Sequence, residues 1–193
     1  MSSFIDLDSS LRNVQLWPNP ANFVVNDSQM SSWFVSSRSV RAFPQEVPKK
    51  QLEFVAALKL LHFVLPYQAN LADTPIIFVD LHCQKYKDRS LVSTISNAHP
   101  QIKFVCEFDK YQVDSNLAPA WIHYKCNMTQ VMRFSRKSAL TFTVSMLDGN
   151  TVQIVDNTPP ALPNPTVQVH ATFEIIPYIR DDEYSNHMVD TMV

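Results

Sequence analysis

The residues with the most evident chemistry are three cysteines and two histidines in the middle of the chain, Cys83, Cys106, Cys126, His82 and His123. Thiolate sulfur and imidazole nitrogen are ligands that zinc prefers, so the set suggests a tetrahedral metal site. All five lie in stretches where apolar and polar residues alternate, the pattern of strands whose successive side chains point to opposite faces. The cysteines fall on the apolar faces and the two histidines on the opposite ones. The set therefore cannot converge on one ion, and we expect buried, free thiols instead.

Hydrolytic catalysis is the next chemistry to consider, because histidines, serines and aspartates are all present. His62, His99 or His170 could each pair with several serines, but no spacing selects one combination. His62 and His170 also lie within strand patterns. The chain has a single glycine, Gly149, whereas phosphate-binding loops, dinucleotide fingerprints and esterase nucleophile turns each require several. The sequence therefore predicts a protein without catalytic activity, cofactor or metal.

Aromatic and basic residues are interleaved in residues 27–50, where Trp33 and Phe34 are followed by Arg38 and Arg41. Such a segment suits a protein interface, and it also suits contact with phosphate. The net charge of −2 and the pI near 6.3 give the chain as a whole no attraction for nucleic acid. We expect a protein-docking loop and no specific nucleic-acid partner, with nucleic-acid contact as the alternative.

The composition is that of a folded domain. A chain of 193 residues, 46% hydrophobic and 18% charged, is long enough to bury a real core. The acidic stretch MSSFIDLDSS does not resemble a secretory signal, and no apolar run approaches the roughly 18 residues of a membrane span. The three cysteines are an odd number and do not fit a disulfide framework. We expect a protein made and kept in the reducing cytosol.

The apolar residues mostly repeat with a period of two, which predicts strands. Residues 51–65 fit a helix or a strand, and we favour the strand because Pro66 ends the run and another strand follows. Asp148-Gly149, between alternating residues in 139–155, predicts a hairpin. Further strands are expected at residues 22–26, 75–86, 102–108, 121–126, 131–136 and 167–179. About eight strands with almost no helix predict an all-β two-sheet sandwich, for which a single jelly roll is the natural candidate.

Two proline-rich segments interrupt this pattern. In Trp17-Pro18-Asn19-Pro20, each proline fixes its own backbone and holds the preceding residue extended, so we expect a rigid corner before the next strand. The side chain of Asn19 can also bond nearby backbone. Residues 157–165 are expected to be an extended connection, because closely spaced prolines cannot join a strand ladder.

The corner belongs to a longer motif, FIDLDSSLRNVQLWPNPANFVV. The motif resembles one found in capsid-associated proteins of nucleocytoplasmic large DNA viruses. There the pattern runs approximately Ile-Asp-Ser-x-x-Arg-Asn, an aromatic residue, then Pro-Asn-Pro-x-x-Phe and a β-branched pair. Two further stretches, KLLHFVLPYQANLADTPIIFVDL and LTFTVSMLDGNTV, are similar to the family's proline-ended strand and late hairpin, so the resemblance spans about residues 4–176. The matching positions in the first motif are Ile5, Asp6, Arg12, Asn13, Trp17, Pro18, Asn19, Pro20, Phe23 and Val24.

The resemblance implies a single jelly roll that acts as a minor capsid protein. Such a protein lies beneath or between the major capsomers and cements them to each other or to the inner membrane layer of a large icosahedral DNA virus. The implied partners are the major capsid protein, other minor capsid proteins, and the internal viral membrane or a protein within it. The chain would be made and assembled in the host cytoplasm and would reside in the virion. No catalytic residue is carried over.

The predicted organisation has three parts: an N-terminal arm with the corner in residues 1–21, a jelly-roll domain in residues 22–179 with the long loop 27–50, and a flexible tail in residues 180–193. We expect the loop, the proline segment and the tail to bury apolar anchors against other subunits. A penton protein with the same fold and a non-viral ligand-binding β-sandwich are the alternatives. The interface candidates are Arg12, Trp17, Pro18, Asn19, Pro20, Trp33, Phe34, Arg38, Arg41, Leu162, Met188 and Met192.

Overall fold

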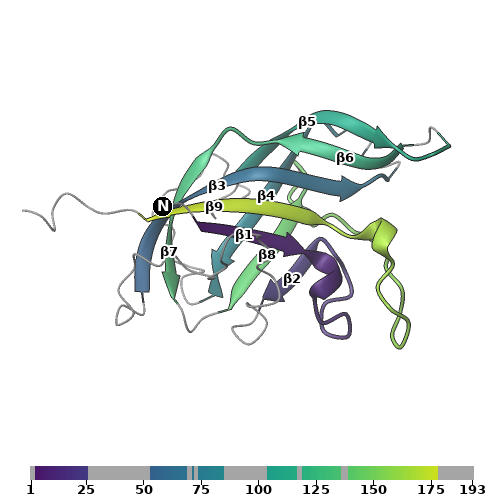
Figure 1. The fold of residues 1–193 in the computed structure, drawn as a ribbon, viewed down its shortest axis with the longest axis horizontal. Coiled ribbons are helices and arrows are strands. Elements are labelled where there is room, and N and C mark those ends of the chain that lie inside the picture. The colour runs from purple at the N-terminus through teal and green to yellow at the C-terminus, as the bar shows by residue number, and fades with distance from the viewer. Residues whose placement is uncertain are drawn as a thin grey trace, which may run out of the picture.

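The computed structural model describes residues 3–25, 53–68, 71, 74–84, 104–116, 119–135 and 139–177 (Figure 1). The predicted loop at residues 27–50 and the predicted tail at residues 180–193 lie outside this set. Six of the interface candidates lie outside it as well, namely Trp33, Phe34, Arg38, Arg41, Met188 and Met192.

Nine strands make up most of the described residues, and no α-helix occurs among them. The strands are β1 (Ser3–Asp8), β2 (Asn22–Val25), β3 (Glu53–Pro66), β4 (Ile76–Cys83), β5 (Phe104–Val113), β6 (Pro119–Lys125), β7 (Thr129–Ser135), β8 (Leu140–Ser145) and β9 (His170–Pro177). Two short 3-10 helices, η1 (Ser9–Leu11) and η5 (Pro165–Val167), follow β1 and precede β9.

All strand pairs are antiparallel, and they form one curled sheet in the order β1-β9-β3-β6-β5-β4-β8-β2. The remaining strand, β7, also pairs with β3. β6 pairs with the end of β3, from Phe63 to Pro66, and β7 pairs with its beginning, from Glu53 to Lys59. β6 and β7 therefore follow one another along the same edge of β3, interrupted at residues 126–128.

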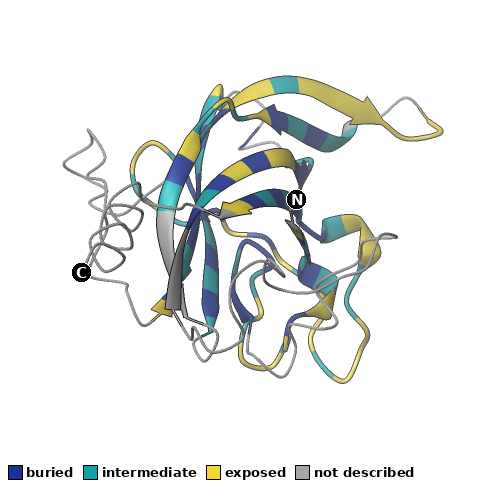
Figure 2. Ribbon diagram, turned by 60° about the vertical axis from the view of Figure 1, so that its left-hand side comes forward, coloured by how far each residue is buried: buried dark blue, intermediate teal, exposed yellow. Residues whose placement is uncertain are grey.

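The core lies between the two halves of this curled sheet, where aromatic rings from opposite halves meet. The ring of Phe63 on β3 lies 6.4 Å from that of Phe142 on β8, and the ring of Phe104 on β5 lies 5.6 Å from that of Phe173 on β9. Buried and exposed residues alternate along the strands, as expected when one face of a sheet packs inward (Figure 2). The fold is all-β and consistent with a sandwich, as the period-two pattern predicted.

The ambiguous segment at residues 51–65 is a strand, β3, and Pro66 is its last residue. The strict alternation of inward and outward side chains that a period of two implies does not continue along this strand, however. A β-bulge between Leu60 and His62 shifts the register against β9, so Leu60 is buried before it and Phe63 after it, while Leu61 is exposed. One extra residue in a strand exchanges the inward and outward faces beyond it.

Residues 3–8 do not belong to an arm, contrary to the predicted boundary at residue 21. They form β1, which pairs along its whole length with β9 from Ser3 opposite Ile175 to Asp8 opposite His170. Ile5 and Leu7 point into the core, so the alternation in FIDLD is a strand signal. The acidic residues of this stretch concealed that signal because they occupy the outward face.

The predicted hairpin at residues 139–155 is partly confirmed. β8 ends at Ser145, and the chain turns through Gly149, whose φ of 89° lies in the left-handed region that glycine tolerates. Beyond the turn only Thr151 bridges back to Ser145, although Val152 and Ile154 are buried as predicted. The returning segment is extended, but it does not form a strand.

The outer half of β5 also departs from strict alternation, which would place Phe108 inward with Phe104 and Cys106. Phe104 and Cys106 are buried, whereas Phe108 is exposed. Register shifts against β6 between Phe108 and Lys110, and again near Val113, rotate this half of the strand outward. Its residues are mostly exposed on both faces, as the upper part of Figure 2 shows.

Candidate functional site

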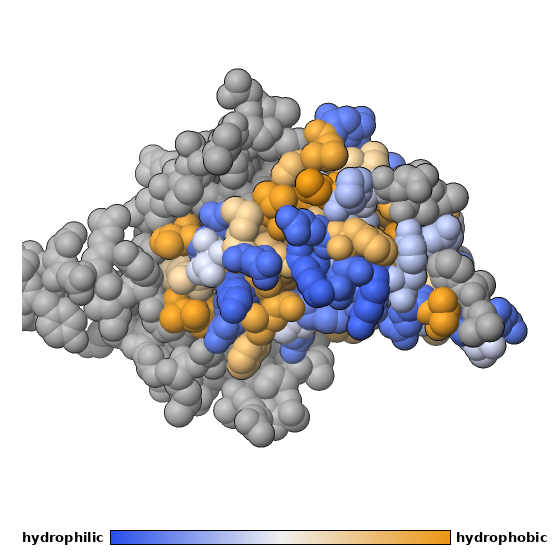
Figure 3. Space-filling view, turned by 90° about the horizontal axis from the view of Figure 1, so that it is seen from above, coloured by the Kyte–Doolittle hydropathy of each residue, from blue (hydrophilic) through white to orange (hydrophobic). Residues whose placement is uncertain are grey.

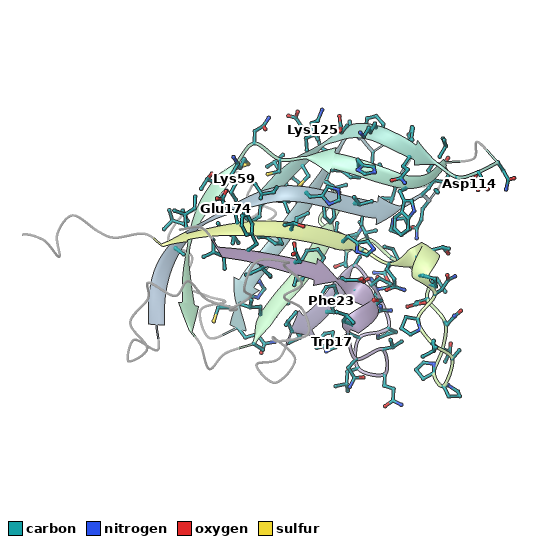
Figure 4. The ribbon with its side chains drawn as sticks, viewed as in Figure 1. Trp17, Phe23, Lys59, Asp114, Lys125 and Glu174 are labelled. Atoms are coloured by element: carbon teal, nitrogen blue, oxygen red, sulfur yellow. The ribbon has the colours of Figure 1, made fainter. Side chains whose placement is uncertain are left out.

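The Pro-Asn-Pro corner and the proline segment meet at one end of the molecule, at the lower right of Figure 1. We call this region the corner end, and it consists of residues 9–21 and 146–168. Hydrogen bonds of side chains, among them those of Arg12 and Asn19, join the two segments. Trp17 is half-buried against the hydrophobic core and lies near Phe23 of β2 (Figure 4).

Asn19 takes the place of a paired strand at the corner. Its Nδ2 donates to the carbonyl oxygen of Val152 at 2.8 Å, and its Oδ1 accepts from the backbone N–H of Ile154 at 3.2 Å. The same oxygen accepts from the N–H of Ala21 at 3.0 Å, which closes a turn around Pro20. A primary amide offers both a donor and acceptors, so one side chain can satisfy two backbone groups that a strand would otherwise pair. This explains why Val152 and Ile154 are buried in an extended segment that is not a strand, although the N–H of Val152 still donates to the carbonyl oxygen of Val144 on β8 at 2.9 Å.

Arg12 is buried, with 4% of its surface exposed, and each of its five N–H groups has an acceptor. Three of the acceptors are backbone carbonyl oxygens, those of Ser9 at 2.6 Å, Trp17 at 2.7 Å and Pro18 at 2.9 Å. The guanidinium therefore fixes the course of the chain from η1 through the first proline.

The other two acceptors of Arg12 lie far along the sequence. Nη1 donates to Oε1 of Gln168 at 2.8 Å, and Nη2 donates to Oδ2 of Asp156 at 2.7 Å. The Arg12 and Asp156 side chains are 0% and 1% exposed, so this is a buried ion pair. Ser9 completes the group, since its hydroxyl donates to Oε1 of Gln168 and accepts from the N–H of Val169. We call Ser9, Arg12, Asp156 and Gln168 the corner network.

Asp156 is held ionised within the corner network. Burial acts to raise its pKa, but hydrogen bonds from Gln168, Asn164, Arg12 and Asn157 outweigh burial, so the pKa lies below its ordinary value. Oδ1 accepts from the N–H groups of Asn157 and Asn164, and Oδ2 accepts from Gln168 as well as Arg12. The carboxylate thus holds the start and the end of the proline segment together.

The outside of the corner end carries large apolar side chains. Leu16 is 66% exposed, Val155 is 86% exposed and Leu162 is 83% exposed. The segments that carry them are joined by the corner network and by Asn19, so these side chains are presented on a fixed backbone. Exposed apolar side chains gathered at one end of a domain are typical of a surface that binds another protein.

The structure therefore brings together six of the interface candidates at one end, but in different environments. Arg12 and Pro20 are buried, Trp17 and Asn19 are half-buried, and Pro18 and Leu162 are exposed. Contact of these residues with a partner stays a prediction, and for Arg12 it would be indirect, through the chain that it holds in place.

Sequence reasoning missed Asp156, Gln168 and Ser9 as members of this site. Arg12 and Asp156 are 144 residues apart, and no local pattern links them. A usable signal was the identity of Arg12 itself, because a buried arginine requires acceptors for its whole guanidinium group. Val155 was missed because it continues the predicted returning strand, where it would have appeared as an ordinary outward residue.

A second cluster lies on the outer face of β9, β3 and β6, and we call His62, Trp121, His123 and His170 the ring cluster. The rings of His62 and His123 lie 5.7 Å apart, and those of Trp121 and His170 lie 5.8 Å apart. Around it, Lys59 on β3 and Glu174 on β9 are register partners (Figure 4). The face of the molecule seen in Figure 3 has hydrophilic side chains near its middle and hydrophobic ones beside them.

Two imidazoles of the ring cluster, those of His62 and His123, are biased toward their neutral form. Burial, and then the proximity of His170, lowers the pKa of His62, while Asp6 opposes this. Burial, and then His62 and Lys110, lowers the pKa of His123, while Asp109 opposes it. The outer face therefore gains positive charge as the pH falls below the ordinary range of histidine.

The five residues first considered for zinc do not converge on one point. Cys83 and Cys106 are buried and Cys126 is half-buried, all as free thiols. His82 contacts Oδ2 of Asp80 at 2.9 Å, and His123 contacts Oε1 of Gln112 at 3.0 Å on the outer face. Within the described ranges, no group of three or more metal-ligating side chains is placed to hold an ion. In the same part of the chain, no helix is long and apolar enough to cross a membrane.

Comparison with known proteins adds no relative, because no protein-family model matches the chain and no curated protein is significantly similar to it.

Proposed function

We propose that the fold is a single jelly roll. If β6 and β7 are counted as one interrupted strand, the described residues form eight strands, and the order in the sheet becomes 1-8-3-6 followed by 5-4-7-2. A jelly roll consists of two four-stranded antiparallel sheets with this order, formed by two Greek keys. The aromatic contacts between the two halves support the same assignment, since facing sheets share one core.

On this fold we propose that the protein is a minor capsid protein that cements the major capsomers of a large icosahedral DNA virus. The sequence resemblance described above supports this role. The observation that carries it is the corner end, where a buried arginine network holds two segments rigidly and presents Leu16, Val155 and Leu162 to the outside. A preorganised apolar surface binds with a small loss of conformational entropy, as a cementing subunit requires.

The corner end is the surface proposed to contact the major capsid protein. The motif that carries the family resemblance, from Arg12 to Pro20, forms one half of this surface. The proline segment with Leu162, predicted from sequence to meet another subunit, forms the other half. Exposed apolar residues would be covered by this contact, while the corner network would stay intact beneath them.

The test is the mass of the purified chain in solution, measured by light scattering alone and with the major capsid protein of the same virus. A monomer that joins the capsid protein supports the proposal, and a stable pentamer of the chain alone replaces it with a penton role. A monomer that ignores the capsid protein overturns it. That result would favour the alternative of a ligand-binding β-sandwich, because Trp121 of the ring cluster lies on a strand face, where an aromatic ring can contact a ligand.

Two matched variants locate the contact. Full burial of a leucine side chain contributes about 1.5–3 kcal/mol, so Leu162→Ser is expected to weaken binding about ten- to a hundredfold. Leu61→Ser is the control, because Leu61 is also exposed but lies on β3, away from the corner end. Equal weakening by both variants would place the contact elsewhere.

A further inference from the structure

Two of the three cysteines lie side by side on neighbouring strands. In the antiparallel pairing of β5 with β6, Glu107 is opposite Lys125. The next pair in the same register is Cys106 and Cys126, at the point where β6 ends. Each thiol is also the largest cause of the shift in the other's pKa, in agreement with this register.

This geometry matches the requirements of a disulfide. Directly opposite residues of an antiparallel pair have Cα atoms about 4.5 or 5.5 Å apart, depending on the type of pair. A disulfide needs a Cα separation of about 4.4–6.8 Å, so either type of pair can be bridged without separating the strands. Cys83 lies on a different strand, β4, opposite Leu140 of β8.

We propose that Cys106 and Cys126 are an oxidisable pair that forms an intramolecular disulfide with peroxide, Cys126 being the residue oxidised first. The proposal is independent of the capsid role.

The environments of the two thiols differ in the way that this reaction requires. The hydrogen bond from Cys106, opposed by burial and Glu107 and aided by the N–H of Met128, lowers the pKa of Cys126 to about 7. The hydrogen bond with Cys126, together with burial, raises the pKa of Cys106. Cys106 also has the carbonyl oxygen of Phe104 as an acceptor at 3.6 Å. Cys126 is half-buried and can meet a small oxidant, whereas Cys106 is fully buried.

The reaction balances in two steps. The Cys126 thiolate attacks one oxygen of hydrogen peroxide, the O–O bond breaks, and the released hydroxide takes a proton to become water, leaving a sulfenic acid on Cys126. The sulfur of Cys106 then attacks the Cys126 sulfur, the S–O bond breaks, and the hydroxyl leaves as water with the proton of Cys106. Two thiols and one peroxide thus give one disulfide and two waters.

The experiment treats the reduced, full-length chain with hydrogen peroxide, denatures it and labels the remaining thiols with N-ethylmaleimide. Intact mass and peptide mapping then count the thiols. We expect three labels before oxidation and one afterwards, on Cys83, with a linked peptide pair that contains Cys106 and Cys126. Three labels after treatment, a link through Cys83, or a dimer linked through Cys126 would each overturn the proposal.

Variants and the pH dependence sharpen this result. Cys83→Ala should still lose two thiols, whereas Cys126→Ser should form no disulfide. If Cys106→Ser fails to fold, Cys126→Ser still decides the matter, because its position is half-buried. The initial rate should rise about tenfold from pH 6 to pH 8, against nearly a hundredfold for a thiol of ordinary pKa. A nearly hundredfold rise in the initial rate would show that Cys126 is not the residue oxidised first.

Discussion

Replacing Arg12 with alanine is the sharpest test of the corner network. The substitution removes five hydrogen bonds, but its cost depends on which acceptors are left without a partner. Gln168 keeps the Ser9 hydroxyl, and the Ser9 carbonyl keeps the N–H of residue 12. The carbonyl oxygens of Trp17 and Pro18 lose the arginine donor, and Asp156 loses its only ionic partner in the corner network.

The magnitude follows from these losses. Asp156 keeps three donors, from Asn157, Asn164 and Gln168, so its charge remains partly compensated. An orphaned buried carbonyl costs about 1–3 kcal/mol, and removal of one member of a buried ion pair costs about 3–5 kcal/mol. We expect Arg12→Ala to lower the free energy of unfolding by about 3–5 kcal/mol, which is a large share of the stability of a domain of this size.

The assay is urea unfolding at neutral pH, monitored by tryptophan fluorescence, with slope and midpoint both fitted. Lys125→Ala is the control, because Lys125 forms a surface ion pair with Asp109 and its side chain is 66% exposed; it should cost at most about 1 kcal/mol. Arg12→Lys should restore little of the lost stability, since an ammonium group lacks the planar arrangement of five N–H donors that a guanidinium group has. A loss for Arg12→Ala no larger than the control's, or full rescue by lysine, would refute the reasoning.

Three further predictions concern other groups. The pKa of Asp156 is depressed in the folded chain, so the ionised carboxylate stabilises the fold fully above about pH 4, and this contribution is lost as the pH falls further. The difference in urea midpoint between wild type and Asp156→Asn should therefore stay constant from pH 7 to pH 5 and become smaller by pH 3. The pKa of His62 is depressed as well, so His62 takes up a proton less readily in the folded chain than in the unfolded one, and wild type should lose stability below about pH 6.5. Between pH 7.5 and pH 5.5, His62→Gln should lose less stability than wild type. Equal losses of stability would contradict this. Asn19→Ala should cost about 1–3 kcal/mol in the same urea assay, because the carbonyl of Val152 and the N–H of Ile154 lose their partner, and a cost near zero would mean that water replaces the amide.

Much of the fold was predictable because a strand with one buried face has alternating apolar and polar residues in its sequence. Val79, Leu81 and Cys83 alternate inward on β4, and Ala171, Phe173 and Ile175 do so on β9, as expected. The pairing order was not predictable in the same way, because β1 finds β9 at the far end of the chain. Alternation specifies which face is buried, but it does not specify the neighbouring strand.

The errors have local physical causes. The bulge beside Leu61 and the register shifts near Phe108 each insert a residue into a strand. Because the side chains before and after the insertion are apolar, the alternation of apolar and polar residues does not reveal it. The returning segment after Gly149 alternates like a strand, yet Asn19 takes two of its backbone groups. At the corner end, the sequence indicated an extended corner at the prolines, but two of the five acceptors of Arg12, on Asp156 and Gln168, are distant residues that only the fold brings near.

The long sequence separation between Arg12 and two of its acceptors, Asp156 and Gln168, has a consequence for synthesis. Gln168 is 156 residues away from Arg12, so the corner network cannot close until the ribosome has made nearly all of the described chain. Contacts of such long sequence separation also form slowly after release. A product that stops before Asp156 would leave Arg12 without its two distant acceptors, and the two segments of the corner end would not be joined through Arg12. Because the surface is completed last, only a finished molecule can present it.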